Sequence, residues 1–328
     1  MLRLLLFVGF FLLTSAGRSP HADYVTRLNQ ESAFGPKLSD NLLLDAILDV
    51  PDMIRRYNYP MEEHFVITPD GYILGVQRIP HGRDRNNIPG DRPAVFVMHG
   101  LLSSSADYLI SGPGDALAYL GHTKHNLLRV IAPYSANFAA LARLIGLGEF
   151  LPNRAIWTWV GQNICKDKAP LQVVCKNIFF FIGGHNEDQF NATLLPIKFG
   201  HFPAGASVRQ LSHYGQSIST SMFRRYDYGW AQNLLRYGTP EPPHYNLSNI
   251  DCPVHLHYSE SDPLADVIDV NKLFNELGGT PIRIRVPDKK FSHIDFVWGI
   301  DAKALVYDNV IEIMKNFDKT EKKTKDFR

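Results

Sequence analysis

The stretch Phe291-Ser292-His293-Ile294-Asp295-Phe296-Val297-Trp298-Gly299 lies near the C-terminus and closely follows the apolar run 282–286. Upstream, Asp262 comes soon after the apolar run 254–258. Continuous apolar runs suit strands buried on both faces, and the ends of parallel strands present polar residues at one edge of an open sheet. An acid followed by a histidine, each just past a strand, therefore predicts an Asp262–His293 acid–base pair at that edge.

The predicted pair has defined roles in acyl transfer. His293 would take the proton of a nucleophile as general base and return it to the leaving alcohol. Asp262 would fix the tautomer of the imidazole and stabilise the imidazolium. We expect the heavy atoms of the pair to lie about 2.6–3.2 Å apart. Asp266 and Asp295 are the alternative acids.

The run Ala94-Val95-Phe96-Val97-Met98 is apolar at every position, which predicts a central strand buried on both faces. It leads into His99-Gly100-Leu101-Leu102, where the backbone N–H of Leu101 could donate to an oxyanion. The run 127–132 is another strand of this kind. A serine nucleophile in such a sheet stands on a G-x-S-x-G turn. No serine of the chain has glycine both two positions before and two positions after it.

Other hydroxyl groups are poor substitutes for that serine. Gly121-His122-Thr123-Lys124-His125 has threonine for serine and histidine for the second glycine. The serines at 103–105 stand in the oxyanion loop itself, where we expect loop contacts, and Ser217 follows no strand. We therefore expect His293 to face a space without a hydroxyl or thiol.

The remaining periodicity predicts the flanking elements. A helix is expected at 40–50, and Pro51 either ends it or starts a second short helix. A hairpin is expected at 63–79 with its turn at Pro69-Asp70-Gly71. A final helix over 302–317 would cover the sheet with one apolar face. That face consists of Val306, Val310, Ile313 and Phe317.

Residues 136–236 show a different pattern. The segments 138–147 and 171–182 are apolar without strand alternation and suit short helices, and the second contains Phe179-Phe180-Phe181. An insertion of this kind is what a lid over an apolar substrate requires. The same residues are equally compatible with a helical subdomain that packs its own core.

The N-terminus has the features of a secretory signal peptide at 1–16. Arg3 is followed by the apolar stretch 4–13 and by small residues at 14–16. Since no other segment has about 18 uninterrupted apolar residues, we expect no transmembrane segment in the mature chain. The formal net charge of +1 gives no global field that favours nucleic acid. The charged tail 319–328 is expected to fray.

Two glycosylation sequons begin at Asn191 and Asn246, as befits a secreted protein. In an oxidising compartment Cys165 and Cys175 could close a short loop, which would leave Cys252 as a buried free thiol at the start of a strand. A zinc site made of the three cysteines is the alternative. Because the spacing contains no C-x-x-C pair, we expect no metal.

These landmarks together resemble the acid lipase family, which comprises gastric and lysosomal lipases and their insect relatives. The acid and histidine motifs are the most specific part of the resemblance. The motifs that carry it are Glu62 to Leu74, His99 to Leu102, Asp188 to Asn191, Ala204 to Val208, Ser261-Asp262 and Ser292 to Gly299. The resemblance implies an α/β-hydrolase fold with a helical lid insertion.

The resemblance also implies a gap between residues 120 and 127. Family members continue there through two further central strands and the G-H-S-x-G turn, so that roughly 70 residues would be absent from this chain. The implied organisation divides the chain into five parts. They are the signal peptide 1–16, the first part of the hydrolase core 17–135, the lid 136–236, the second part of the core 237–318 and the charged tail 319–328.

The reaction implied by the resemblance is hydrolysis of fatty-acyl esters of glycerol or sterols, without metal or organic cofactor. The implied partners are a lipid ester or fatty-acyl ligand and a lipid–water interface, in a secreted or lysosomal setting. This chain should lack that activity because its nucleophile is missing. The alternative is a non-catalytic lipid-binding or storage protein.

Overall fold

The computed structural model describes residues 40–83, 94–110, 148–151 and 154–326. The chain divides into two units, Met1–Asp40 and Asn41–Arg328, and everything described below belongs to the second apart from Asp40 itself. The predicted signal peptide, the strand at 127–132 and the helix at 138–147 lie outside the described residues.

Two short helices precede an antiparallel hairpin. Helix α2 spans Asp40–Ile47, and α3 spans Val50–Arg56 with a proline in its first turn, so the second of the two possibilities at Pro51 is correct. Strands β1 (Glu62–Ile67) and β2 (Ile73–Arg78) pair antiparallel, and the hairpin prediction is confirmed. Gly71 lies in its turn with a φ of +91°, a conformation that glycine adopts without steric cost.

The segment 94–98 departs from its prediction. It has no strand structure and forms no ladder with another described segment. Phe96 is 74% exposed and Val95 is 55% exposed. The prediction of a doubly buried strand was wrong because a strand that is apolar on both faces needs neighbouring strands and covering helices, and the described part of the chain supplies neither at this segment.

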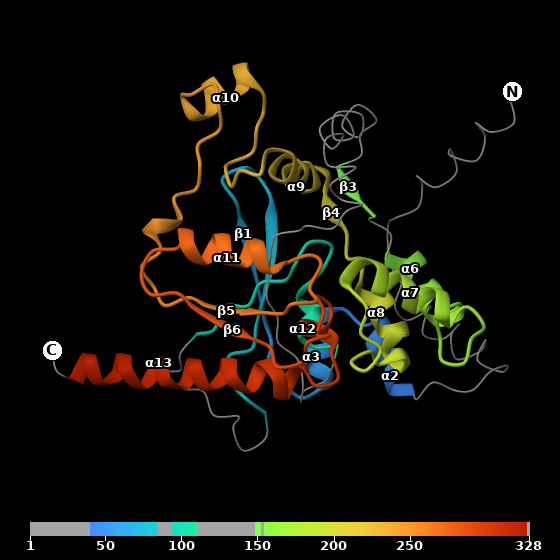
Figure 1. Cartoon of the computed structure of the whole chain (residues 1–328). Helices are drawn as coiled ribbons and strands as arrows, with labels where there is room; N and C mark the ends of the chain where they lie inside the picture. Colours follow the sequence, from blue (N-terminus) through green and yellow to red (C-terminus); the bar gives the residue numbers. More distant parts are fainter. Residues whose placement is uncertain (1–39, 84–93, 111–147, 152–153, 327–328) are drawn as a thin grey trace, which may run out of the picture. The chain divides into compact units, whose positions relative to one another are not determined.

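The C-terminal part contains the parallel strands of the described structure. Strand β5 (His255–Tyr258) pairs with β6 (Ile282–Arg285), and α11 (Val267–Glu276) connects them (Figure 1). This βαβ unit places the loops after both strands at the same edge. The runs at 254–258 and 282–286 are thus confirmed as strands.

The last helix is longer than predicted. A π-helical turn at Lys303–Tyr307 leads into α13, Asp308–Asp326. Val306 and Val310 pack in one core cluster with Val286 of the β6 end, whereas Phe317 is 51% exposed. The prediction that 319–328 frays was wrong up to Asp326, because the helical backbone continues through the charged run.

The helical part of the chain lies between the β1–β2 hairpin and strand β5 in the sequence. Its longer helices are α6 (Arg154–Asn163), α7 (Gln172–Gly183), α8 (Leu195–His201), α9 (Val208–Thr220) and α10 (Trp230–Tyr237) (Figure 1). Short elements are η2 (Ser105–Tyr108), η4 (Ala192–Leu194), η5 (Leu247–Asn249), α12 (Asp295–Trp298) and the paired β3 (Glu149–Phe150) and β4 (Ala206–Ser207). None of the helices described combines the length and the apolar character that crossing a bilayer requires.

An aromatic core holds α7 and α8 against the end of α12. Phe179 makes edge contacts with Phe199 and Trp298, with ring centres 5.2 and 5.4 Å apart. Of the three consecutive phenylalanines, Phe179 and Phe180 are buried and Phe181 is exposed. The helix predicted at 171–182 is confirmed, and two of its three phenylalanines pack a core as the simpler of the two interpretations requires.

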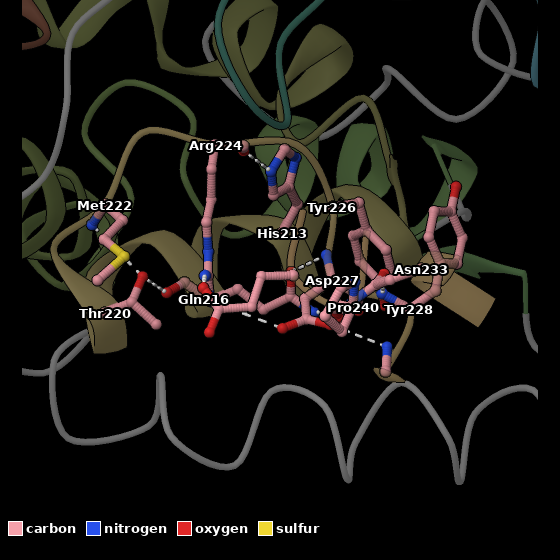
Figure 2. A network of polar contacts seen from close by, with 12 residues as sticks. His213, Gln216, Thr220, Met222, Arg224, Tyr226, Asp227, Tyr228, Asn233 and Pro240 are labelled. Atoms are coloured by element: carbon pink, nitrogen blue, oxygen red, sulfur yellow. Dashed lines mark hydrogen bonds and ion pairs between the residues drawn. The ribbon is translucent and has the colours of Figure 1, made fainter. Parts of the chain in front are cut away.

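The connection from α9 to α10 is fixed by polar contacts rather than by apolar burial. Gln216 and Asp227 bond twice, since the side-chain amide donates to the Asp227 carbonyl at 2.8 Å and accepts from the Asp227 N–H at 2.9 Å (Figure 2). The buried Asn233 donates to the Asp227 carboxylate at 2.7 Å and to the Pro240 carbonyl at 2.9 Å (Figure 2). His213 contacts the Arg224 carbonyl at 2.9 Å. This network fixes the conformation of the chain between α9 and α10, ahead of β5.

Candidate active site

The structure places Asp262 and His293 in contact. The imidazole Nδ1 of His293 lies 3.0 Å from Oδ2 and 3.2 Å from Oδ1 of Asp262. Asp262 follows β5 and His293 follows β6, so the parallel pairing of these strands brings the two loops together. Through Nδ1, the carboxylate can hold the tautomer that leaves Nε2 as a proton acceptor.

Hydrogen bonds fix the two loops to each other. The Ser259 hydroxyl donates to the Phe291 carbonyl, and the Ser261 hydroxyl donates to the Lys289 carbonyl at 2.7 Å. The Asp262 carboxylate also accepts from the backbone N–H groups of Leu264 and Ala265, both at 2.8 Å. The orientation of the acid is therefore set locally and does not depend on a substrate.

The end of α7 supports both loops from the side. The backbone N–H of His293 donates to the Gly183 carbonyl at 2.9 Å. Gly184 has a φ of +93°, and a Cβ at this position would lie only 2.9 Å from Cβ of Ser292 and 3.2 Å from the Ser261 carbonyl. A glycine is required here both by the backbone conformation and by the close approach.

The charge of Asp262 is maintained in spite of its burial. Burial would raise its pKa, but the neighbouring imidazole of His293 and the hydrogen bonds from His293, Ala265 and Leu264 together hold the pKa below its usual value. The acid is thus ionised at neutral pH and can stabilise an imidazolium.

The alternative acids have other partners. Asp266 caps α11 by accepting from the N–H groups of Ile268 and Asp269 at 2.8 and 3.1 Å. Asp295 is buried, and its Oδ2 accepts from the Ser292 N–H at 2.7 Å and from Asn186 at 2.9 Å. Burial raises the pKa of Asp295 against these hydrogen bonds. Asp262 is therefore the acid that the geometry favours.

The predicted oxyanion loop is held by a backbone hydrogen bond to Ala204. Leu102 has a φ of +63°, and its carbonyl accepts from the Ala204 N–H at 2.7 Å. Directly after the loop, η2 packs against α12, which begins just after His293. Leu101 is half-buried in a turn of this loop.

The serines of this loop have structural partners. The Ser104 hydroxyl caps η2 by accepting from the Ala106 N–H, and the Ser105 hydroxyl donates to Gln77 at 2.7 Å. Ser103 hydrogen-bonds to Asp107. Ser217 lies within α9, and the Thr123 turn lies outside the described residues. Among the residues that the structure describes, none forms a hydrogen bond with Nε2 of His293.

The cysteines and sequons are placed as follows. Cys165 and Cys175 form a disulfide between the ends of α6 and α7, which removes both thiolates from any zinc site. Cys252 is exposed, so its prediction as a buried thiol was wrong; it precedes β5 rather than lying within it. Asn191 and Asn246 each cap a 3-10 turn with the side-chain oxygen, and Asn246 is exposed.

Two buried ionisable residues were not found by sequence reasoning. Asp107 lies in η2, and burial raises its pKa to about 7 against a hydrogen bond from Ser103. Lys198 is wholly buried in α8, and burial lowers its pKa to about 7. The signal for Lys198 was a single lysine between Ile197 and Phe199, within an otherwise apolar segment.

Comparison with known proteins gives a consistent result. Residues 50–112 match the family described as "Partial alpha/beta-hydrolase lipase region". Lipase 3 of Drosophila melanogaster is 28% identical, covering 83% of this chain and 94% of that protein. These matches confirm the resemblance to the acid lipase family. The gastric triacylglycerol lipase of Bos taurus is 28% identical over 82% of this chain and 92% of that lipase, and the human lysosomal acid lipase/cholesteryl ester hydrolase is 27% identical over 82% and 91%.

Similarity to these lipases implies the α/β-hydrolase fold. The alignment with the Drosophila relative extends over 371 residues, although this chain has only 328. The relative therefore has residues, within the aligned span, for which this chain has no counterpart.

Proposed function

We propose that this chain is a secreted or lysosomal member of the acid lipase family that keeps the acid–histidine half of the catalytic site and lacks the nucleophile. The family reaction is hydrolysis of fatty-acyl esters by Ser-Asp-His acyl transfer. The observation that carries the proposal is the Asp262–His293 contact at 3.0 Å in a chain without a G-x-S-x-G serine.

Three features support an incomplete catalytic core. The alignment with relatives is longer than the chain itself. The segment 94–98, which is apolar enough for a central strand, is exposed and unpaired among the described residues. Beyond these, β5 and β6 form an isolated two-stranded sheet in the described structure. We infer that two central strands, together with the nucleophile turn that ends the second of them, are absent between residues 120 and 127.

The chemistry follows from what remains. With Asp262 ionised, His293 can accept a proton at Nε2, but among the described residues no hydroxyl is hydrogen-bonded to this atom to supply one and then attack a carbonyl carbon. The Leu101 N–H can donate to an oxyanion, whereas the usual second donor follows the nucleophile and is missing with it. We therefore expect no acyl-enzyme and no turnover above weak residual catalysis.

We also propose that residues 136–236 form the lid between the core parts 17–135 and 237–318. The described helices α6 to α10 support this assignment. The preceding signal peptide 1–16, the sequons at Asn191 and Asn246 and the Cys165–Cys175 disulfide support passage through an oxidising secretory compartment. A lipid–water interface is the expected setting.

Non-catalytic binding of lipid is the second candidate function. It is favoured by apolar side chains that α6 and α7 leave exposed. These side chains are Ile156, Trp159, Val174, Ile178 and Phe181. A chain that binds fatty-acyl ligands without hydrolysing them would use such an apolar surface, and its function would not require a nucleophile.

Ester hydrolysis by the secreted full chain tests the proposal. The substrate is p-nitrophenyl butyrate, and the variants are His293→Ala and, as a matched control, His244→Ala at an exposed histidine outside the site. We expect the same background rate for all three proteins. Turnover that His293→Ala abolishes and His244→Ala retains would overturn the proposal.

Sequencing of transcripts across the junction between Leu120 and Asn126 separates two origins of the gap. A transcript that encodes G-H-S-x-G in frame at this position would assign the present chain to a locus that also produces a conventional lipase. Absence of such coding sequence would favour the lipid-binding function.

A further inference from the structure

Lys198 is a buried lysine whose amine has no hydrogen-bonding partner among the described residues. Its side chain is 0% exposed, and its Nζ forms no hydrogen bond with any described residue. The Nζ lies 4.2 Å from the ring centre of Phe190 and 5.4 Å from that of Trp298. Contacts with two ring faces offset part of the cost of burying an ammonium group, but they leave its N–H donors unused.

Trp298, the second of the two rings that contact Lys198, also has a donor without a partner among the described residues. The indole Nε1 of Trp298 is buried and has no partner in the described part of the chain. Lys198 on α8 and Trp298 at the end of α12 therefore bring two unpaired donors to the same aromatic cluster. Buried donors in folded proteins are nearly always paired, so this combination calls for an acceptor.

The described part of the chain does not provide the acceptor. Asp295 is the charged group that acts on Lys198, and its charge opposes the lowering of the lysine pKa by burial. Its Oδ2 is already engaged by the Ser292 N–H, the Ser292 hydroxyl and Asn186. Burial raises the pKa of Asp295, which favours its neutral form. Within the described structure, Asp295 therefore does not form an ion pair with Lys198, because its carboxylate is bonded to Ser292 and Asn186.

We propose that Lys198 and Trp298 bind the carboxylate of an apolar monocarboxylate, such as a free fatty acid. The Lys198 Nζ would form an ion pair with one carboxylate oxygen, and the Trp298 Nε1–H would donate to the other. Two donors match the two oxygens of a single carboxylate, whereas a phosphate would bring further charged oxygens into apolar surroundings. This site is independent of ester hydrolysis by the chain.

The walls of the site favour a ligand with an apolar body. The residues around the two donors belong to one buried cluster of aromatic and aliphatic side chains. They include Phe179, Phe190, Leu195 and Phe199. A hydrophilic ligand such as citrate would have to bury its other carboxylates among these apolar side chains, which offer no donor to offset their loss of hydration.

Titration of the full chain with octanoate tests this inference, with the tryptophan fluorescence and the heat of binding as readouts. We expect saturable binding of one octanoate. Lys198→Met, which keeps the length of the side chain and removes a buried charge, should weaken it about tenfold or more, as expected for loss of a charged hydrogen bond. Trp298→Phe should weaken the heat-detected binding by a smaller factor, because it removes only the N–H donor.

The neutral alcohol 1-octanol is the matched ligand control. It should bind the wild-type protein and Lys198→Met alike, because it carries no charge for the lysine to pair with. Equal affinities of the wild-type protein for octanoate and octanol, or unchanged octanoate affinity in Lys198→Met, would overturn the inference.

Proton uptake by the wild-type protein provides a test that needs no variant. Burial lowers the pKa of Lys198 to about 7 in the empty site, and a bound carboxylate must raise it. Calorimetry at pH 8 in buffers of different ionisation enthalpy should therefore detect uptake of close to one proton per octanoate bound. Binding without proton uptake would contradict the proposed ion pair.

Discussion

The sequence predicts that the strands before Asp262 and His293 and the segment 94–98 belong to one sheet, yet within the described structure only the former pair with each other. The loops are joined by side-chain hydrogen bonds to backbone carbonyls and by the parallel pairing of β5 with β6. The segment 94–98 is apolar at every position but is exposed and unpaired within the described structure. Local polar contacts thus hold Asp262 against His293, while the segment 94–98 stays unpaired within the described structure.

The difference shows which parts of the fold depend on distant neighbours. A loop that bonds to the next strand end in the same βαβ unit needs only that unit to take its shape. A central strand gains its stability from partners on both edges and from helices on both faces. The proposed absence of two strands would therefore have a large effect at 94–98 and a small one at Asp262.

The largest expected effect comes from truncating a matched phenylalanine in each region. Phe291 is fully buried beside the Asp262–His293 loops, and its ring contacts Phe296 edge to face. Phe291→Ala should lower the free energy of unfolding by about 3–5 kcal/mol through lost burial and cavity formation. Phe96→Ala should change it by less than about 0.5 kcal/mol because Phe96 already faces solvent.

Urea denaturation followed by circular dichroism measures both values. A large loss of stability for Phe96→Ala would show that 94–98 is buried in solution, and the contrast between the two regions would then fail.

A smaller effect is expected from the disulfide that joins α6 to α7. Changing both Cys165 and Cys175 to Ala should reduce the free energy of unfolding by about 2–3 kcal/mol, because the open loop regains entropy in the unfolded chain. Cys252→Ala is the matched control, since that cysteine is exposed and unbonded. Equal stability of the double variant and the control under non-reducing conditions would refute the loop-closure argument.

The sequence could indicate the elements whose residues interact locally. The hairpin at 63–79 was evident from its Pro-Asp-Gly turn, and α7 from an apolar segment without strand alternation. The proximity of Asp262 and His293 followed from their positions after two strands. The exposure of Phe96 could not be foreseen from the run itself, because burial depends on which strands the rest of the chain contributes. Nor does composition tell whether Lys198 finds a counter-ion.

A further effect on stability is a pH dependence at Asp107, in the short helix η2 that follows the predicted oxyanion loop. Burial raises the pKa of Asp107 from 3.8 to about 7, so the folded state keeps a proton that the unfolded state releases over that range. The contribution of Asp107 to stability is therefore fully present below pH 4 and is lost as the pH rises through 7, by at most about 1.4 kcal/mol per pH unit.

Asp107→Asn removes this titration, because the amide stays neutral. The difference in unfolding free energy between the variant and the wild-type protein should shift in favour of the variant from pH 4 to pH 7. Thermal unfolding of both proteins across this range provides the comparison. A difference that stays constant with pH would show that Asp107 ionises normally in the folded state.

The most direct test of the central claim is the search for a nucleophile that His293 can activate. The full chain is incubated with a fluorophosphonate, which forms a covalent adduct with serine nucleophiles activated by a neighbouring base, and its intact mass is then measured. With Asp262 and His293 in place but no nucleophile before Nε2, we predict no increase in mass. A stoichiometric adduct on a hydroxyl or thiol side chain that disappears in His293→Ala would contradict the account.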